Sequence, residues 1–473
     1  MQSKTLFGSH ERILWIMVFA FSALRLISAP AFGYGVDEAH YLLYARHLDW
    51  SYFDHPPLVG WVHYLFSFFG ENELIARIPA ILLGALDTVL IYGLLKQYDR
   101  TAALWAAAAL NGSFVLDVLF LTLMPDSLLL TAMLLAVYAL RRLLADPSVT
   151  SYLLMGIAFG LAGLSKYTAV LLIPAAIAYV LWVRRPQLLF TPKLAMTFLS
   201  ALVIISPVIV WNLHNGMASF AYQSSHVVGA ENGNWKNFFL SLGRQAGAYN
   251  PLLFIVAFYG LYHALKERSF RLETAFGIAI LGFMFVSQYR HVALPHWISP
   301  FFLLFIPIGI VYLYRRSPKT AKTVVIISLS LSTIIHAELI AKLGKFSDYR
   351  SAFRDILGWN RVAEHAAQHL RALQTQNGAL AVTNWSLASR IMVYTDAPVF
   401  LIDERQDQFD LWQKDSPLGK DLLFINPRSF HKAIAQTYQC SSVQTLSSEN
   451  VVLNGAIVDT FSYELCRNYG GMK

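Results

Sequence analysis

Three acidic sites stand out in this sequence, because each carboxylate lies beside glycine or proline at the edge of an apolar segment. Asp37 and Glu38 follow a Gly-Tyr-Gly segment, Asp54 precedes His55 and two prolines, and Asp126 follows a proline. A carboxylate at a membrane boundary is costly and is therefore a functional candidate. Such a group can deprotonate an attacking nucleophile or bind a cation.

Basic residues that could bind an anion fall in loops predicted on the same side of the membrane. They are Lys166, Arg244 and Arg290, together with His55, His291 and His296. Cationic side chains pair well with phosphate oxygens. Acidic groups for an acceptor, beside basic groups for an anionic leaving group, indicate transfer from a lipid phosphate.

Each of these candidates also has a purely structural interpretation. Asp37 could cap a juxtamembrane helix, with Glu38 favourable in its first turn, and Asp126 could be another helix N-cap. Lys166 could be a snorkelling residue at the membrane interface. The two lone histidines His291 and His296 are only a weak metal signal.

The elements that must position these residues are membrane helices. The 473 residues are 56% hydrophobic and 14% charged, with a mean hydropathy of +0.47, whereas soluble domains carry about 25% charged residues. We therefore expect a transmembrane domain at residues 1–344 and a soluble domain at 345–473. Eleven apolar segments are expected, at 12–30, 75–96, 101–120, 125–140, 151–164, 168–183, 194–211, 250–265, 272–287, 293–314 and 323–341. Several are shorter than the ~20 residues of an upright span, which predicts tilted or re-entrant spans within 101–183.

The Lys and Arg residues predict the orientation. Sixteen lie in loops on one side and five in loops on the other, and the positive side stays in the cytoplasm. We expect a cytoplasmic N-terminus and an extracytoplasmic C-terminal domain. Because this pattern reflects membrane topology, the net charge of +8 does not indicate nucleic-acid binding. The first segment, followed by Ala29-Pro30-Ala31, could instead be a signal peptide, although Pro30 and the internal Arg25 argue against cleavage.

The tail alternates helical and strand-like patterns and is expected to be a small α/β domain. A helix is predicted at 361–373, and strands at 379–383, 398–402, 421–425 and 456–459. The two cysteines, Cys440 and Cys466, both lie in this domain. An oxidising compartment favours their pairing as a disulfide, with two buried thiols as the alternative.

Several ordered motifs carry a resemblance to a known family. They are Asp37-Glu38-x-x-Tyr41, Tyr52-Phe53-Asp54-His55-Pro56-Pro57-Leu58, Pro125-Asp126, Gly163-Leu164-Ser165-Lys166-Tyr167-Thr168 and Pro207-Val208-Ile209-Val210-Trp211-Asn212. Over roughly residues 30–300 the sequence resembles bacterial polyprenyl-phosphate-dependent glycosyltransferases. These are akin to protein O-mannosyltransferases and to the lipid A aminoarabinose transferase.

The resemblance implies a GT-C fold, with a helix bundle, juxtamembrane helices in the first outer loop and the site at the outer interface. By position, Asp37 matches the general base of an inverting transfer, with Glu38 beside it. Asp54 and Asp126 match pocket carboxylates that hold a divalent cation in some relatives. Lys166 matches a basic residue on the phosphate side. His55 stands where the aminoarabinose transferase has a lysine, which argues against aminoarabinose as the sugar.

The expected substrates are a polyprenyl-phosphate sugar donor and a lipid, glycan or protein acceptor, in contact with the lipids of a bacterial inner membrane. A transporter or flippase of lipid-linked sugars is the alternative. A transporter should place its ionisable groups at mid-span on facing helices. Because the carboxylates cluster in predicted outer loops, the sequence favours the enzyme.

Overall fold

The computed structural model describes residues 8–228, 233–343, 352–375 and 377–473. The chain forms two compact units, which we call the membrane unit and the α/β unit. The membrane unit comprises Met1–Ile27, Asp49–Val59 and Ala76–His336, and the α/β unit comprises Ser28–Leu48, Gly60–Ile75 and Ala337–Lys473. The α/β unit thus includes two pieces of the first loop as well as the tail. The domain boundary predicted at residues 344 and 345 lies outside the described residues and stays a prediction.

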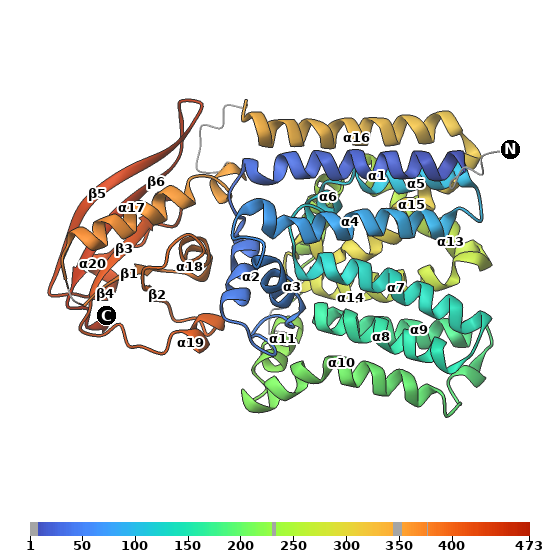
Figure 1. Ribbon diagram of the computed structural model, residues 1–473, viewed down its shortest axis with the longest axis horizontal. Coiled ribbons are helices and arrows are strands. Elements are labelled where there is room, and N and C mark those ends of the chain that lie inside the picture. Colours follow the sequence, from blue (N-terminus) through green and yellow to red (C-terminus); the bar gives the residue numbers. More distant parts are fainter. Residues whose placement is uncertain (1–7, 229–232, 344–351, 376) are drawn as a thin grey trace. The chain divides into compact units, whose positions relative to one another are not determined.

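The membrane unit is a bundle of apolar helices joined by short loops (Figure 1). Its helices are α1 (Ser9–Ser28), α4 (Glu73–Leu95), α5 (Arg100–Leu110), α6 (Phe114–Leu119), α7 (Pro125–Ala145), α8 (Val149–Ser165), η2 (Tyr167–Leu171), α9 (Leu172–Trp182), α10 (Leu194–His214), α11 (Ala218–Val228), α12 (Trp235–Ala248), α13 (Pro251–Lys266), α14 (Arg271–Arg290), η5 (Pro295–Ile298), α15 (Ser299–Arg316) and α16 (Pro318–Ala341).

The expected count of eleven spans is not confirmed. Within the described residues, seven helices are long and apolar enough to cross a membrane, or eight if α12 and α13 form one span bent by 109°. The bend follows from Asn250-Pro251, since Asn250 has a φ of 71° and its side chain caps α13 by accepting from the Leu252 N–H at 3.1 Å. The segment at 101–120 is broken into α5 and α6. The segments at 151–164 and 168–183 form α8 and η2 with α9, which are shorter apolar helices.

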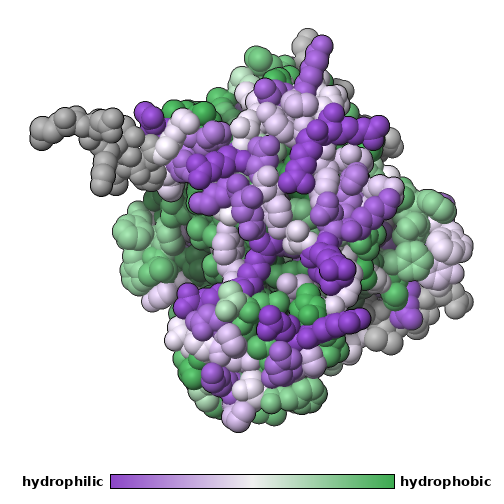
Figure 2. All heavy atoms as spheres, turned by 90° about the vertical axis from the view of Figure 1, so that its right-hand side faces the viewer, coloured by the Kyte–Doolittle hydropathy of each residue, from purple (hydrophilic) through white to green (hydrophobic). Residues whose placement is uncertain are grey.

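The loops rich in Lys and Arg meet at one end of this bundle. Arg141 forms an ion pair with Glu273 at 2.6 Å, Arg315 donates to the carbonyl of Tyr98 at 3.4 Å, and the Tyr98 hydroxyl donates to the carbonyl of Ser269 at 3.3 Å. Viewed from the end where α1 begins, hydrophilic side chains cover the middle of the face (Figure 2). The predicted grouping of these loops on one side is therefore seen in the bundle.

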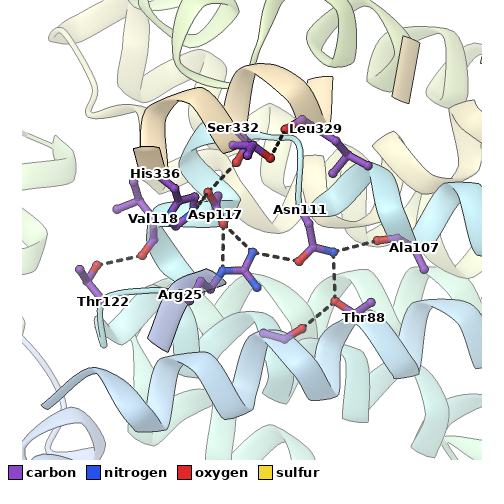
Figure 3. A network of polar contacts seen from close by, with 12 residues as sticks. Arg25, Thr88, Ala107, Asn111, Asp117, Val118, Thr122, Leu329, Ser332 and His336 are labelled. Carbon is purple, nitrogen blue, oxygen red and sulfur yellow. Dashed lines mark hydrogen bonds and ion pairs between the residues drawn. The ribbon is translucent and has the colours of Figure 1, made fainter. Parts of the chain in front are cut away.

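A buried polar network holds α1, α6 and α16 together (Figure 3). The Asp117 carboxylate accepts from Arg25 Nε at 2.9 Å and from Ser332 Oγ at 2.7 Å, and its Oδ2 lies 2.8 Å from His336 Nε2. Arg25 also donates to Asn111 Oδ1 at 2.9 Å. Because a charge in an apolar bundle must be paired, the network explains how Arg25 and Asp117 are tolerated there. Asp117 therefore has a structural role in the bundle.

The α/β unit is built on a five-stranded mixed sheet with the order β2-β1-β3-β6-β5. The strands β1, β2 and β3 are parallel, and β6 pairs antiparallel with both β3 and β5. A second sheet pairs β4 with β7. The strands are β1 (Gly378–Val382), β2 (Val399–Leu401), β3 (Asp421–Pro427), β4 (Tyr438–Gln439), β5 (Ser442–Leu453), β6 (Ala456–Arg467) and β7 (Gly471–Met472), and the helices of the tail are α17 (Trp359–Ala372), α18 (Trp385–Met392), α19 (Gln408–Trp412) and α20 (Ile434–Thr437). The predicted small α/β domain is confirmed, and so is the Cys440–Cys466 disulfide, whose Cα atoms lie 5.4 Å apart.

The helix that follows the first span, α2 (Val36–Arg46), packs inside the α/β unit. Its His40 is buried, and the Nδ1 atom of this residue lies 3.2 Å from the Oγ atom of Ser389 in α18. The His40 ring also packs against those of Trp385 and Phe409, with centroids 5.5 and 5.6 Å apart. The first-loop helix is therefore held by elements more than 340 residues away in the sequence. A further helix, α3 (Leu58–Ser67), begins in the membrane unit and continues into the α/β unit.

Candidate active site

The centre of the candidate site is an ion pair between Asp126 and Lys166 in the membrane unit. The Lys166 ammonium lies 2.7 Å from each carboxylate oxygen of Asp126, and both residues are buried. Helix α7 begins at Pro125, a residue suited to a first helical position, with Met124 as its N-cap. Lys166 ends α8 in extended backbone and leads into η2. Asp126 is therefore not an N-cap, and Lys166 is not a snorkelling residue; both of these interpretations are wrong.

Two histidines and a tyrosine surround this ion pair. His296 Nε2, in η5, lies 4.0 Å from Asp126 Oδ2, and His55 also interacts electrostatically with the same carboxylate. Tyr249 is fully buried at the bend between α12 and α13 and interacts with Asp126 too. Its hydroxyl donates to the carbonyl of Pro295 at 2.9 Å, which ties the bend to η5. The site is thus assembled from places where helices begin, end or break.

The loop that carries Asp54 and His55 is anchored to α10 and α11. Trp211 Nε1 donates to Asp49 Oδ2 at 2.8 Å, and Ser219 Oγ donates to the carbonyl of Tyr52 at 2.8 Å. Gln223 Nε2 donates to the carbonyl of Asp54 at 2.8 Å. The motifs around Asp54 and Trp211, distant in the sequence, therefore meet in the fold.

An apolar pocket lies next to the charged cluster. It has a volume of about 330 Å³ and is lined by Phe114, Val115, Val118, Leu119, Met124, Ala248, Pro295 and His296. His296 belongs to both the pocket lining and the cluster around Asp126. Since α7 has 21 residues and runs from Asp126 to the basic loops, the cluster lies about 30 Å from those loops, at the other end of the bundle.

The first acidic pair, Asp37 and Glu38, lies in the first turn of α2 in the α/β unit. Gly35 is the N-cap of this helix, and its N–H donates to Glu38 Oε2 at 3.3 Å. Glu38 is buried, whereas Asp37 is half-buried. The interpretation of Asp37 as the helix cap is therefore wrong, because the stabilising contact comes from Glu38. Asp37 stays a candidate base.

The structure brings Lys166 and His55 together at Asp126, and it places the two predicted arginines on α12 and α14. Arg244 is exposed on α12. Arg290 is half-buried at the end of α14, where its carbonyl accepts from Asn237 Nδ2 at 3.1 Å. Their predicted role in phosphate binding stays a prediction.

The residues predicted to hold a metal do not form a coordination cluster in the described part of the chain. In that part, no group of three or more His, Cys, Asp or Glu side chains is arranged to hold an ion. Both oxygens of Asp126 accept from Lys166. The arrangement at Asp126 therefore fits an ion pair better than a divalent cation, which needs several oxygen ligands.

Comparison with known proteins agrees with this geometry. A family model described as dolichyl-phosphate-mannose-protein mannosyltransferase matches residues 54–211, a range that contains Asp54, His55, Asp126 and Lys166. Crystal structures of ArnT from Cupriavidus metallidurans, bound to undecaprenyl phosphate and in the apo state, are 16% and 17% identical to this chain. Each superposes on this chain with a TM-score of 0.66, and the matched region covers 97% of this chain and 98% of the ArnT chain. The chain has a GT-C fold.

A curated relative extends this likeness to the sequence level. The lipid A galacturonosyltransferase RgtD of Rhizobium johnstonii (strain DSM 114642 / LMG 32736 / 3841) is 24% identical over 264 residues, 54% of this chain. The match spans 55% of that relative, so the chain matches about half of its length. The predicted resemblance to GT-C glycosyltransferases is confirmed. The protein is a polytopic membrane protein.

Two parts of the candidate site carried little signal in the sequence. His296 was one of several outer-loop histidines, and only the fold brings it to Asp126. Tyr249 was not predicted at all, although the following Asn-Pro pair marks a helix break that could have drawn attention to it. Contacts between residues so far apart in the chain leave no local pattern.

Proposed function

We propose that this protein is a membrane glycosyltransferase that transfers a sugar from a polyprenyl-phosphate donor to a lipid, glycan or protein acceptor. The observation that carries the proposal is the position of His296, in both the charged cluster and the apolar pocket. A ligand that fills both has an anionic head and an apolar tail. A polyprenyl phosphate has this chemistry, and the ArnT structure bound to undecaprenyl phosphate supports the choice.

The charges of the cluster suit a phosphate that becomes more negative during the reaction. Lys166 provides a fixed cation, and His55 and His296 add positive charge when they are protonated. Electrostatic stabilisation of a leaving group is strongest where water is excluded. In this proposal Asp126 holds the Lys166 ammonium in place before the donor binds. Arg244 of α12 and Arg290 at the end of α14 add positive charge to the donor side.

The proposed chemistry is one displacement at the anomeric carbon. Asp37 accepts the proton of an acceptor hydroxyl or amine, with Glu38 holding the first turn of α2. The acceptor atom then forms a bond to the anomeric carbon while the bond from that carbon to the phosphate oxygen breaks. Attack from the face opposite the phosphate inverts the configuration, and the polyprenyl phosphate leaves with the bonding electrons. No step of this mechanism uses a metal, and Asp54 is assigned to the lining of the pocket.

We place the reaction on the outer face of a bacterial inner membrane. The basic loops gather at the end of the bundle about one helix length from Asp126, and such loops stay in the cytoplasm. The Cys440–Cys466 disulfide supports an oxidising compartment for the α/β unit. A reporter active only in the cytoplasm, fused after Lys473, should be silent. Full activity of the reporter would contradict this orientation.

The decisive experiment for the reaction measures transfer by the purified full-length protein in lipid nanodiscs. The donor is a polyprenyl-phosphate sugar and the acceptor is lipid A, because the curated relative is named as a lipid A glycosyltransferase. We expect two products: free polyprenyl phosphate and labelled acceptor. Transfer should be lost in Lys166→Met combined with Asp126→Asn. It should be kept in Lys319→Met, which changes an exposed lysine in the first turn of α16. Movement of the lipid-linked sugar across a liposome bilayer without transfer would instead identify a flippase.

A further inference from the structure

The α/β unit contains an open polar groove that the proposed donor site does not use. Its volume is about 770 Å³, within the range of ligand-binding pockets. We call it the α2–α17 groove, because Arg46 at the end of α2 and residues of α17 line it. Its polar lining consists of Arg46, Glu71, Glu364, Arg371, Tyr394 and Asp396, with the hydroxyl of Thr395.

One wall of the groove is held in place by hydrogen bonds. Arg46 donates to the carbonyls of Met392 and Val393 at 2.8 and 2.9 Å and forms an ion pair with Glu71 at 3.2 Å. The guanidinium is therefore fixed while it remains partly exposed, with 33% of the side chain accessible. A side chain ordered before binding loses little conformational entropy when a ligand arrives.

Tyr394 extends this fixed wall. Its hydroxyl donates to Glu73 Oε1 at 3.0 Å and accepts from the Tyr34 N–H at 2.9 Å. Its ring stacks on that of Tyr34, with centroids 5.3 Å apart and planes 28° apart. The aromatic ring at the groove is thus ordered by contacts from both its face and its hydroxyl.

The other side of the groove offers polar groups that a ligand could use. Arg371 and Asp396 are exposed, and within the residues that the structure describes neither side chain has a hydrogen bond or an ion pair. Glu364 lies on the same helix as Arg371 and accepts only the amide of Gln368, at 3.3 Å, among the contacts described. Apolar side chains of Ala367, Leu370 and Pro398 also line the groove.

This mixture points to one class of ligand. Two arginines and three carboxylates rule against a purely anionic or purely cationic ligand, and the polar lining rules against an acyl or polyprenyl chain. A sugar ring matches, because its hydroxyls donate to carboxylates and accept from guanidinium groups while its C–H face packs on apolar and aromatic side chains.

We propose that the α2–α17 groove binds the oligosaccharide part of the acceptor, whether free or lipid-linked. This inference rests on the proposed glycosyltransferase function and names the acceptor as a glycan rather than a protein. The α/β unit then recognises the acceptor, and the charged cluster of the membrane unit binds the donor.

The test measures binding of the deacylated glucosamine disaccharide of lipid A to the full-length protein in nanodiscs, without donor. Arg371→Ala and Asp396→Ala are exposed substitutions that should leave the fold intact. Each removes hydrogen bonds to a charged group, and about a tenfold weaker binding is expected. Arg428→Ala, an exposed arginine of the same unit outside the groove, is the matched control and should bind like wild type.

Steady-state kinetics separate this inference from the proposed function. With lipid A as acceptor, Arg371→Ala should raise the acceptor KM about tenfold and leave the donor KM unchanged. Unchanged disaccharide binding in both groove variants, or equal loss in the control, would overturn the inference while transfer activity stands. No transfer by wild type, with groove-dependent binding retained, would remove the enzyme proposal and leave a glycan-binding groove. The assignment to a glycan would be overturned if the protein bound a serine-containing peptide but not the disaccharide, and if Arg371→Ala abolished that peptide binding.

Discussion

The Lys166 ammonium lies 2.7 Å from both carboxylate oxygens of Asp126, so two residues that the sequence assigned to different ligands form one ion pair. The motif order had suggested phosphate for Lys166 and a cation for Asp126. A buried lysine and a buried aspartate stabilise each other, and each would be costly alone. In the proposed cycle the donor phosphate can share Lys166 with Asp126 without leaving either charge unpaired.

Breaking this pair on one side should destabilise the protein. Lys166→Ala leaves the Asp126 carboxylate buried without its cation, which typically costs about 3–5 kcal/mol in the free energy of unfolding. The double variant Lys166→Met with Asp126→Asn removes both charges and should recover most of that stability without recovering donor use. Thermal unfolding of matched preparations, with transfer assays beside it, checks both statements. A Lys166→Ala protein as stable as wild type would show that the pair contributes nothing to folding.

Asp37→Asn tests the proposed general base. The substitution keeps the shape of the side chain and does not touch the cap of α2, which is Gly35 with Glu38. Turnover should fall by ~10²–10⁴, the usual contribution of a positioned base, while donor binding persists. Glu38→Gln is the control, because its amide oxygen still accepts from the Gly35 N–H, and it should cost much less. Near-normal turnover by Asp37→Asn would refute the mechanism and leave the fold unaffected.

Trp412→Ala tests whether the tail holds the helix that carries Asp37. The Trp412 ring stacks on His47 at 4.7 Å and contacts Tyr44 at 5.9 Å, both on the α2 side of the unit. Its removal should weaken this packing by about 1–3 kcal/mol, since the ring is only half-buried. Hydrogen exchange in α2 should then quicken by about tenfold or more, and turnover should drop while the donor KM is kept.

The matched control for Trp412→Ala is Phe430→Ala, another aromatic side chain of the same unit that is 41% exposed. It should leave exchange in α2 unchanged. Equal exchange in α2 for the two variants would mean that the tail does not order this helix through Trp412.

Asp407, the N-cap of α19, predicts a pH dependence of the α/β unit. Burial raises the pKa of its carboxyl to about 6, and the nearby carboxylates of Asp403 and Asp410 raise this pKa too. The hydrogen bond from the Phe409 N–H and the charge of His40 lower it by less. The folded state therefore holds this proton more tightly than the unfolded state does. Stability contributed by the site is present below about pH 4 and is lost as the pH rises to about 6, by at most about 3 kcal/mol.

Asp407→Asn isolates this effect because asparagine caps a helix about as well and does not titrate. Between pH 4 and pH 6 the Tm of wild type should fall relative to the Tm of Asp407→Asn, and above about pH 6 the difference should stay constant. A difference independent of pH over that interval would contradict the raised pKa.

Composition, charge and ordered motifs were enough to predict a membrane helix bundle with a small α/β domain and a GT-C resemblance. Hydropathy and the Lys and Arg pattern act locally, over one span or one loop, so they can be read along the chain. The Cys440–Cys466 disulfide followed from there being two cysteines in one domain. Several strands of the tail followed from short apolar runs, such as the run at 421–425 that lies in β3. The count of eleven spans is not confirmed, because an apolar run does not show whether the helix within it is long enough to cross a membrane, as with the short helices Val149–Ser165 and Tyr167–Trp182.

Only the tertiary structure decided which charges meet. Asp126 and Lys166 are 40 residues apart, and Asp126 and His296 are 170 apart, so their pairing depends on how helices pack rather than on any local pattern. The same holds for α2, whose His40 contacts Ser389 although the sequence placed that helix with the bundle. Desolvation makes an unpaired charge or polar group costly, and the packing that satisfies such groups is a property of the whole fold. For this reason the sequence could name candidate site residues, while their partners and the α2–α17 groove appeared only in three dimensions.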